Sequence, residues 1–256
     1  MIKLKLPALA LGLSCLAATA CDKSEADSVT PDTTTSTGTT SVTSVVQAKY
    51  TSAVTISTSG SSITLKSNGT PDHPTPYYAT TNPLWEAQRT GYTLNPGTVG
   101  VQNYSMTIPT EPAAAATKEA TALGPIGMAL NGVAIYNDQE GGNKALDTGV
   151  IGSFDRAGAH PGPGNTYHYH VAGDFTTKDD ANLVGFLRDG FPIYGRKDKD
   201  GTYPANLDAY GGHTGSTTEF ASGIYHYHCS NVNYLSTGVY VLKSGSYYGT
   251  KGTFTF

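Results

Sequence analysis

The sequence predicts a mainly β protein: a single β-rich, sandwich-like domain built on an internal duplication of hairpin, loop and strand units. Three observations support this fold class. Runs of β-forming residues, such as AVTIST and SSITLKS, alternate with Gly, Ser and Asn turns. Helical periodicity is scarce, and several motifs occur twice in the same order. Because each copy is short for a core of its own, we expect both to form one domain.

The beginning of the chain is typical of a bacterial export signal, which we place at residues 1–20. Lys3 and Lys5 precede an apolar run that is too short to span a bilayer, and small residues follow. Because Cys21 stands directly after LAATA, we expect a lipoprotein with Cys21 lipidated; ordinary cleavage nearby is the alternative. The sequence therefore predicts a lipid-anchored protein of the cell envelope, with the membrane as a partner.

A Ser- and Thr-rich segment follows the signal at residues 21–46. It contains few large apolar side chains, so it cannot bury enough surface to offset the entropy of ordering. We expect a disordered tether here and a folded β domain at 47–256.

Composition excludes several classes of protein. Cys15 lies in the signal and Cys21 is assigned to lipid, so Cys229 remains alone and no internal disulfide is expected. A net charge of −4 with 16 Lys and Arg provides no concentrated basic face, and nucleic acid is not an expected partner. The sequence has no G-x-S-x-G, phosphate-binding loop or dinucleotide fingerprint, so neither a serine triad nor nucleotide chemistry is predicted.

One segment of the domain favours a helix, EPAAAATKEATAL at residues 111–123. Glu111 and Pro112 suit a first turn and the alanines favour helix, although a solvated loop is an alternative.

The duplication is visible as two motifs that recur 58 residues apart. GMALNGVAIY at 127–136 aligns with GFLRDGFPIY at 185–194, and TYHYH at 166–170 aligns with IYHYH at 224–228. Each copy opens with an Asn-Gly or Asp-Gly pair, which predicts a β-hairpin with a two-residue type I′ turn. Pro192, which lacks an N–H, predicts an edge or a bulge in the second copy.

A third motif, D-x-x-G-x-H, lies between these two in each copy. DRAGAH at 155–160 aligns with DAYGGH at 208–213, at an offset of 53 residues. The second copy therefore carries five more residues before its YHYH. We place repeat one at 124–170 and repeat two at 182–228.

The YHYH histidines are predicted to bind a transition metal. Side chains alternate along a strand, so the two histidines of each YHYH share a face, with roughly 7 Å between their Cβ atoms. The histidine of the nearby D-x-x-G-x-H loop supplies a third ligand. The candidate ligands are His168, His170 and His160 in repeat one, and His226, His228 and His213 in repeat two. Three neutral imidazoles suit copper or zinc and leave a position for water or substrate.

Three aspartates are candidates for a supporting role around these ligands. Asp155 or Asp208 can accept the second ring N–H of a ligand histidine and fix its tautomer. Asp189 and Asp208 are available for proton transfer, although the Asp-Gly context of Asp189 already explains it as a turn residue.

These motifs resemble the bacterial YHYH family, which is common among exported proteins and has no assigned activity. SNGTPDH at 67–73, NGVAIY at 131–136, DGFPIYG at 189–195 and both YHYH strands carry the resemblance, over roughly residues 60–245. It implies a role for His73. Many members carry a cysteine between the Asp and His of the first loop; none is present here, which leaves Cys229 unpaired.

Two arrangements of the histidines remain open. The four YHYH histidines can form one shared site, with His73, His160 and His213 around it, or the repeats can hold two three-histidine sites. The sequence favours a metal-binding protein. The alternatives are a metal-dependent enzyme, either a hydrolase or a copper oxidoreductase, and a surface module that binds glycan or protein through exposed tyrosines.

Overall fold

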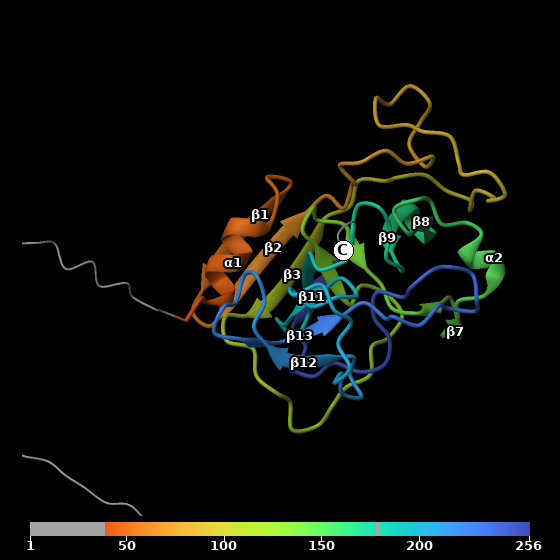
Figure 1. Cartoon of the computed structure of the whole chain (residues 1–256). Coiled ribbons are helices and arrows are strands. Elements are labelled where there is room, and N and C mark those ends of the chain that lie inside the picture. The colour runs from red at the N-terminus through yellow and green to blue at the C-terminus, as the bar shows by residue number, and fades with distance from the viewer. Residues whose placement is uncertain (1–38, 178–179) are drawn as a thin grey trace, which may run out of the picture. The chain divides into compact units, whose positions relative to one another are not determined.

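A computed structural model describes residues 39–177 and 180–256 of the chain (Figure 1). Strands dominate these residues, so the mainly β fold class is confirmed. The expected signal peptide, Cys21 and the tether up to residue 38 lie outside the described residues. Within the described residues, no helix has the length and apolar character needed to cross a membrane.

The helix α1 (Val42–Lys49) changes the expected start of the domain. The Ser41 hydroxyl accepts the backbone N–H of Ser44 and caps its first turn. Val42, Val45 and Val46 are buried against the domain because their spacing places them on one face of a helix. The tether predicted at residues 21–46 therefore ends too late in the sequence, since residues 42–46 belong to the folded helix α1.

A four-stranded antiparallel sheet follows α1. Buried and partly exposed residues alternate along its strands, as expected for a sheet with one face packed on the core. Its strands, in sheet order, are β1 (Val54–Ser59), β2 (Ser62–Ser67), β3 (Tyr104–Pro109) and β14 (Thr253–Thr255).

A larger sheet of eight strands carries both YHYH segments. Its order is β12-β13-β11-β10-β4-β5-β9-β8, so β8 and β12 are its edges. The strands are β4 (Gly127–Ala129), β5 (Ala134–Ile135), β8 (Ala159–Gly162), β9 (Thr166–Tyr169), β10 (Leu183–Leu187), β11 (Pro192–Tyr194), β12 (Gly212–Gly215) and β13 (Ile224–His228).

The pairings in this sheet are the same on both sides of its central pair, β4 and β10. β5 pairs with β9 in parallel, and β11 pairs with β13 in parallel. Each YHYH strand then pairs antiparallel with an edge strand, β9 with β8 and β13 with β12. This pattern supports the internal duplication that the sequence predicts.

The remaining elements are short and lie in repeat one. They are β6 (Gln139–Glu140), β7 (Lys144–Ala145), α2 (Thr148–Ile151) and a 3-10 turn (Pro163–Asn165). β6 and β7 form a separate two-stranded sheet, which presents Glu140.

The core lies on both faces of the large sheet. On one face, Met128 and Phe186 pack with Ile63 of the four-stranded sheet, which gives the sandwich-like layering. On the other face, Tyr169 and Tyr227 are buried with the rest of the YHYH tyrosines. The tyrosines and histidines of each YHYH therefore face opposite sides of the sheet, as the alternation predicts.

Both expected hairpins are present, but their turn type differs from the prediction. The Ala129 N–H donates to the Val133 carbonyl, so the loop contains three residues rather than two. Gly132 and Gly190 have φ values of +87° and +83°, whereas Asn131 and the Asp before Gly190 are not in the positive-φ region. A type I′ turn needs positive φ at both central residues, so these are three-residue turns that end in a left-handed glycine.

Two further local expectations are corrected. Residues 111–123 form no helix; Ala114 and Ala120 instead make isolated bridges to the segment 246–249. Pro192 is not at a sheet edge, because β11 lies between β10 and β13. It is the first residue of β11, a position that tolerates a residue without an N–H. The alternative expectation, a bulge, has support, since the pairing of β10 with β11 shifts register between Leu183 and Gly185.

Candidate metal centres

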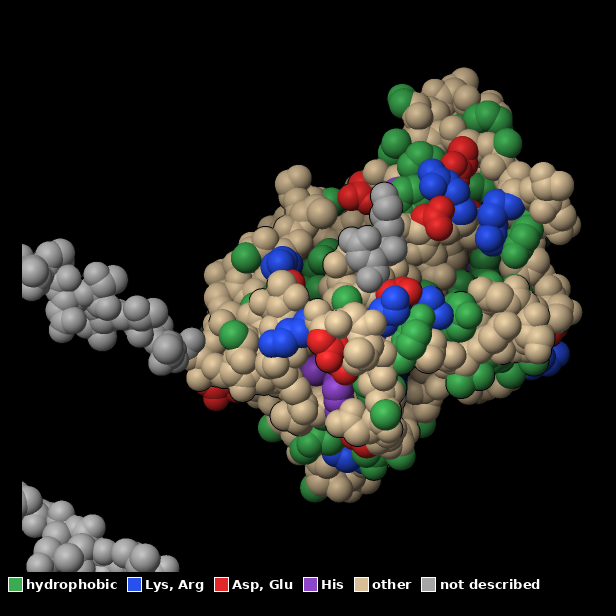
Figure 2. Space-filling model, in the orientation of Figure 1, with side chains coloured by type: hydrophobic (Ala, Val, Ile, Leu, Met, Phe, Trp, Pro, Cys, Tyr) green, Lys and Arg blue, Asp and Glu red, His purple; other side chains and the backbone are tan. Residues whose placement is uncertain are grey.

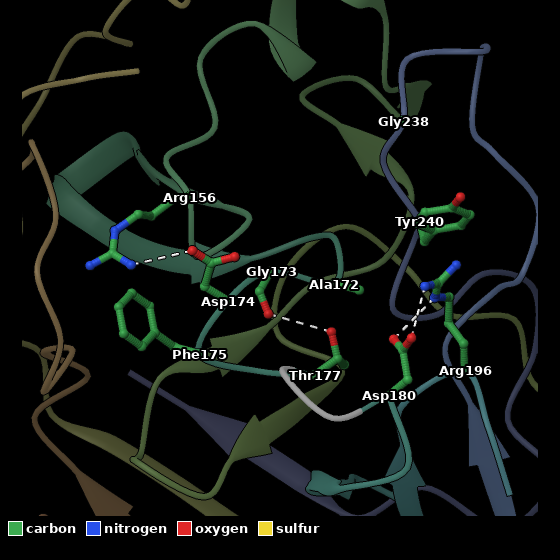
Figure 3. A pocket seen from close by; sticks show the side chains of 10 residues that line it. All are labelled: Arg156, Ala172, Gly173, Asp174, Phe175, Thr177, Asp180, Arg196, Gly238 and Tyr240. Carbon is green, nitrogen blue, oxygen red and sulfur yellow. Dashed lines mark hydrogen bonds and ion pairs between the residues drawn. The ribbon is translucent and has the colours of Figure 1, made fainter. Parts of the chain in front are cut away.

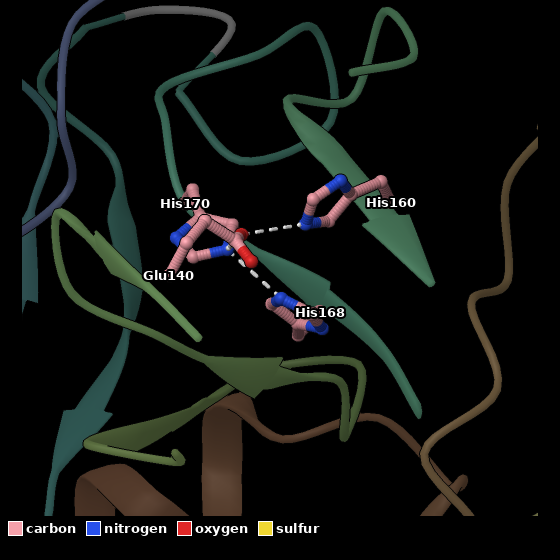
Figure 4. A group of neighbouring side chains, drawn as sticks. All are labelled: Glu140, His160, His168 and His170. Carbon is pink, nitrogen blue, oxygen red and sulfur yellow. Dashed lines mark hydrogen bonds and ion pairs between the residues drawn. The ribbon is translucent and has the colours of Figure 1, made fainter. Parts of the chain in front are cut away.

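Four side chains of repeat one converge at one edge of the large sheet (Figure 4). His160 on β8 lies directly opposite His168 on β9, and His170 follows two residues later on the same face. Glu140 of β6 approaches them from the neighbouring hairpin. We call this group of Glu140, His160, His168 and His170 centre 1.

The same arrangement occurs at the opposite edge in repeat two. His213 on β12 lies directly opposite His226 on β13, and His228 follows on the same face. Asp198, in the loop after β11, provides the carboxylate. We call this group of Asp198, His213, His226 and His228 centre 2.

In both centres the Nε2 atoms point inward. The Nε2 atoms of His168 and His170 are 2.8 Å apart, and a Glu140 oxygen lies 3.0 Å from the Nε2 of His160. In centre 2 the Nε2 of His213 is 3.0 Å from that of His226 and 3.1 Å from an Asp198 oxygen. One ligand atom from each residue lies within 4.8 Å of the others in its group. Ligands that surround one ion at about 2.0–2.2 Å are roughly 3–4 Å apart, so each group can hold a metal ion.

The opposite ring nitrogen, Nδ1, is bound outside the centre in every case. In centre 1, His168 Nδ1 donates to the Thr166 carbonyl at 2.7 Å and His170 Nδ1 to the Asn137 carbonyl at 2.6 Å. A carbonyl only accepts, so both Nδ1 atoms carry hydrogen. In centre 2 the matching pairs are His226 with the Ile224 carbonyl and His228 with the Gly195 carbonyl.

The third histidine of each centre is fixed in the same way by a side chain. His160 Nδ1 lies 2.8 Å from the Ser153 hydroxyl, whose own hydrogen is donated to the Val150 carbonyl. His213 Nδ1 lies 3.0 Å from the amide oxygen of Asn206. Because each acceptor takes the hydrogen on Nδ1, the Nε2 atom of the same ring carries none. The Nε2 lone pairs therefore point into the centres.

In each centre, the lone pairs of three histidine Nε2 atoms meet beside a carboxylate. Such a group needs a cation between its members. The cation is either a proton or a metal ion. Burial lowers the pKa of His160 and places that of His168 well below its ordinary value. Burial likewise lowers the pKa of His226, and that of His228 to about 4. Protonation is therefore disfavoured, and neutral imidazole is the form that binds metal.

Glu140 is ionised in this setting. Burial raises its pKa, but hydrogen bonds from His160 and His170 in their protonated form outweigh burial and hold the pKa below its ordinary value; with neutral imidazoles, a bound metal ion would supply the same positive charge. A carboxylate and three imidazoles together form a four-donor set for a divalent cation.

Asp155 and Asp208 of the D-x-x-G-x-H loops do not contact the ligand histidines, so the role expected for them is wrong. Asp155 accepts the backbone N–H groups of Ala157 and Ala159 and the hydroxyl of Tyr167. Asp208 accepts two backbone N–H groups of its own loop and the hydroxyl of Tyr225. The D-x-x-G-x-H motif thus builds a tight turn and ties it to the tyrosine face of the sheet.

His73 and Asp189 also lie on the tyrosine face rather than in a centre. His73 stacks on Phe175 with ring centroids 4.2 Å apart, and its Nε2 lies 2.7 Å from the Tyr169 hydroxyl. Asp189 is fully buried and accepts the hydroxyl of Tyr227 at 2.5 Å. Neither residue reaches a ligand histidine, so both are absent from the two groups.

The structure also decides between the two arrangements left open by the sequence. The YHYH histidines separate into two groups on different edges of the sheet, which contradicts a shared four-histidine site. Cys229 is buried and free, as expected, and belongs to neither group.

Sequence reasoning missed Glu140 and Asp198. The signal was present, because these two acidic residues are 58 residues apart, the same offset as the hairpin and YHYH motifs. The segments around Glu140 and Asp198 do not otherwise match, so the alignment of a Glu with an Asp is a weak signal there.

The surroundings of the two centres differ. Figure 2 shows histidine side chains at the surface over the β12 and β13 region, beside acidic side chains. Centre 1 instead borders a cavity of about 390 Å³, to which Glu140 and His168 contribute.

A larger cavity of about 620 Å³ lies elsewhere (Figure 3). Arg156 and Arg196 stand at its two sides, paired with Asp174 at 3.2 Å and with Asp180 at 2.9 Å. No residue of either centre lines this cavity in the described part of the chain, and both guanidinium groups are already paired.

The fold and the two groups define the class of protein: a mainly β protein with two three-histidine, one-carboxylate centres that can each hold a metal ion. Residues 105–204 match the family model described as YHYH protein, which confirms the resemblance indicated by the motifs. The matched segment contains centre 1 and Asp198 but ends before His213. No curated protein and no solved structure matches the chain.

Proposed function

We propose that the protein is an exported, lipid-anchored protein that binds two transition-metal ions, one in each centre. The orientation of the six imidazoles carries this proposal. Every Nδ1 is bound to an acceptor outside the centre, so every Nε2 lone pair faces the other ligands. Outer hydrogen bonds of this kind orient metal-binding histidines and fix their tautomer.

Copper or zinc is the metal that this donor set favours. Imidazole nitrogen binds both ions strongly, and neither centre contains a thiolate that would select a softer ion. A site of three histidines and one carboxylate has four protein donors, which suits a tetrahedral zinc ion or a tetragonal copper ion.

The surface-module alternative has less support. The YHYH tyrosines cannot serve it, because Tyr167, Tyr169 and Tyr227 are fully buried and Tyr225 is only 6% exposed, which leaves tyrosines elsewhere such as Tyr203, 44% exposed. The YHYH tyrosines therefore offer no aromatic surface to a glycan or a protein.

The decisive experiment is elemental analysis of the purified protein, made without a histidine tag. We expect two ions of copper or zinc per chain. His168→Ala is expected to reduce the content to one ion by removing a ligand of centre 1, and His226→Ala to do the same through centre 2.

His73→Asn is the matched control, because His73 is as buried as the ligands but lies on the tyrosine face. It is expected to retain two ions. Metal content that stays unchanged in both the His168 and His226 variants would contradict the proposal, as would wild-type protein that binds no metal and shows no change in melting temperature when either ion is added.

A further inference from the structure

Centre 1 forms part of the wall of a cavity. Glu140 and His168 line it together with Tyr136, whose ring stacks on His168 with centroids 3.8 Å apart. The cavity measures about 390 Å³. Sites for small molecules typically have roughly 300–1,000 Å³ and mostly apolar walls, so this cavity has the size of a ligand site.

The walls of the cavity are mainly apolar. Leu123, Pro163 and Phe256 line it, and the ring of Tyr136, stacked on that of His168, adds an aromatic wall. Flat aromatic surfaces favour a flat aromatic ligand, which can stack on them.

The side chains of the cavity wall supply no positive charge. Among the described residues that line it, Glu140 is the one charged side chain, and no Lys or Arg is present. The ion proposed for centre 1 would be the one cation beside the cavity, and Glu140 offsets part of its charge. A ligand hydroxyl can donate a hydrogen bond to Glu140 and turn its oxygen toward that ion.

We propose that centre 1 binds a small aromatic alcohol of the phenol class, with the ring against Tyr136 and the hydroxyl directed at Glu140 and the metal position. This inference rests on the proposed metal function, since it identifies the ligand class of one of the two centres. It makes centre 1 the ligand-binding centre of the protein.

The two repeats differ at the residue that follows the carboxylate of each centre. A Cβ built on Gly141, which lines the cavity, would meet no atom within 4 Å, so a larger side chain has room there. The residue 58 positions later, beside Asp198 of centre 2, is Lys199, which is exposed.

The test is a titration of the full chain with 4-fluorophenol, followed by fluorine nuclear magnetic resonance. We expect saturable binding of one molecule per chain. The methyl ether 4-fluoroanisole, which has no hydroxyl to donate, is expected to bind at least about tenfold more weakly.

Gly141→Phe fills the cavity without removing a ligand of the centre, and its φ is not positive. We expect it to weaken 4-fluorophenol binding by at least about tenfold, which is the effect of blocking a site sterically. Lys199→Phe, at the equivalent position of centre 2, is the matched control and is expected to bind like wild type.

Metal content measured on the same samples separates the two proposals. Wild-type protein that binds metal but not 4-fluorophenol, or that binds it equally well after Gly141→Phe, overturns the ligand inference alone. Protein that binds 4-fluorophenol but no metal overturns the metal function and leaves the cavity as an aromatic-alcohol site. Equal loss of binding in both Phe variants also contradicts the assignment to centre 1.

Discussion

Each imidazole of the two centres has one nitrogen held by an acceptor and one directed at the other ligands. The acceptors match between repeats: the carbonyls of Asn137 and Gly195 are 58 residues apart, and the side chains of Ser153 and Asn206 are 53 apart. These offsets equal those of the YHYH and D-x-x-G-x-H motifs. Residues that look like ordinary loop positions thus set the tautomer of the ligands.

The Ser153 hydroxyl is expected to support metal binding at centre 1. Ser153→Ala removes the acceptor of His160 Nδ1 and should weaken metal affinity there by roughly 10- to 100-fold, the usual cost of losing an outer partner. Competition with a chelator of known affinity measures this. Asn206→Ala should affect centre 2 only, and equal loss at both centres in either variant would argue against the separate roles.

Lys243 is a buried cation that penalises the folded state. It is 3% exposed, and burial lowers its pKa from 10.5 to about 8. The folded state therefore releases this proton at lower pH than the unfolded state, and the penalty is present below pH 8 and disappears as pH rises toward 10.5.

Lys243→Met is accordingly expected to raise the free energy of unfolding by roughly 2–3 kcal/mol at pH 7. The advantage over wild type should shrink as pH rises from 8 to 10. Denaturant unfolding at several pH values measures it, with Lys66→Met as an exposed control. An advantage that does not change with pH would show that the ammonium group is not the cause.

Among the elements, the short edge strands are the ones that build the centres. β8 and β12 each place one histidine directly opposite the first histidine of a YHYH strand. Directly opposed residues of an antiparallel pair have Cβ atoms about 4.5–5.5 Å apart, which is close enough for two imidazoles to share an ion. The loop insertion of the second copy lies before β13 and leaves this pairing intact.

The hairpins at the start of each repeat depend on a left-handed glycine. Gly190 has a φ of +83°, and a Cβ there would lie 3.0 Å from two side-chain atoms of Pro109. Gly190→Val is expected to lower the free energy of unfolding by about 3 kcal/mol, from backbone strain and this contact.

Gly201→Val is the matched control for that substitution. Gly201 has a φ of +84°, but a Cβ there meets nothing within 4 Å. It should cost only the backbone strain, about 1–2 kcal/mol. Thermal unfolding compares the two variants, and an equal loss would show that packing against Pro109 contributes nothing.

At the scale of the whole molecule, the large sheet separates the two centres and the smaller sheet covers its middle. Met128 of β4 and Phe186 of β10 contact the four-stranded sheet, while the outer strand pairs carry the histidines. Metal at both edges would hold segments that are far apart in sequence, such as Glu140 and His170. Metal binding should therefore contribute to stability.

Removal of metal is expected to lower the melting temperature. At a free metal concentration one hundredfold above the dissociation constant, each ion stabilises the fold by about 2.7 kcal/mol. A thermal scan with and without a chelator measures the effect. The His168→Ala variant should show about half of the wild-type shift, and an indifferent wild-type protein would contradict both centres.

Anchoring at the envelope is also a property of the whole protein. Cys21→Ala is expected to release the protein from membranes, because it removes the residue proposed to carry the lipid. Fractionation of the producing cells measures this, with Cys229→Ala as the control, since Cys229 is buried in the domain. Continued membrane retention of the Cys21 variant would contradict lipid anchoring.

The sequence by itself determined the fold class, the recurring motifs and the six histidines that the structure brings together. These follow from local rules: side chains alternate along a strand, and a duplicated motif repeats its geometry. It also identified the positive-φ glycines of the hairpins, though not the length of the turns. Residues 111–123 form no helix although their sequence favours one, because bridges to residues 246–249 determine their structure. Local helix propensity alone could not predict this segment.

The tertiary structure alone decided that there are two centres rather than one, and that a carboxylate completes each of them. It also showed that Asp155 binds Tyr167 rather than a ligand histidine, and that a cavity borders centre 1. Strand order and loop packing bring these groups together across long stretches of chain. No periodicity within a single segment encodes such contacts, so they become visible only when the sheet is assembled.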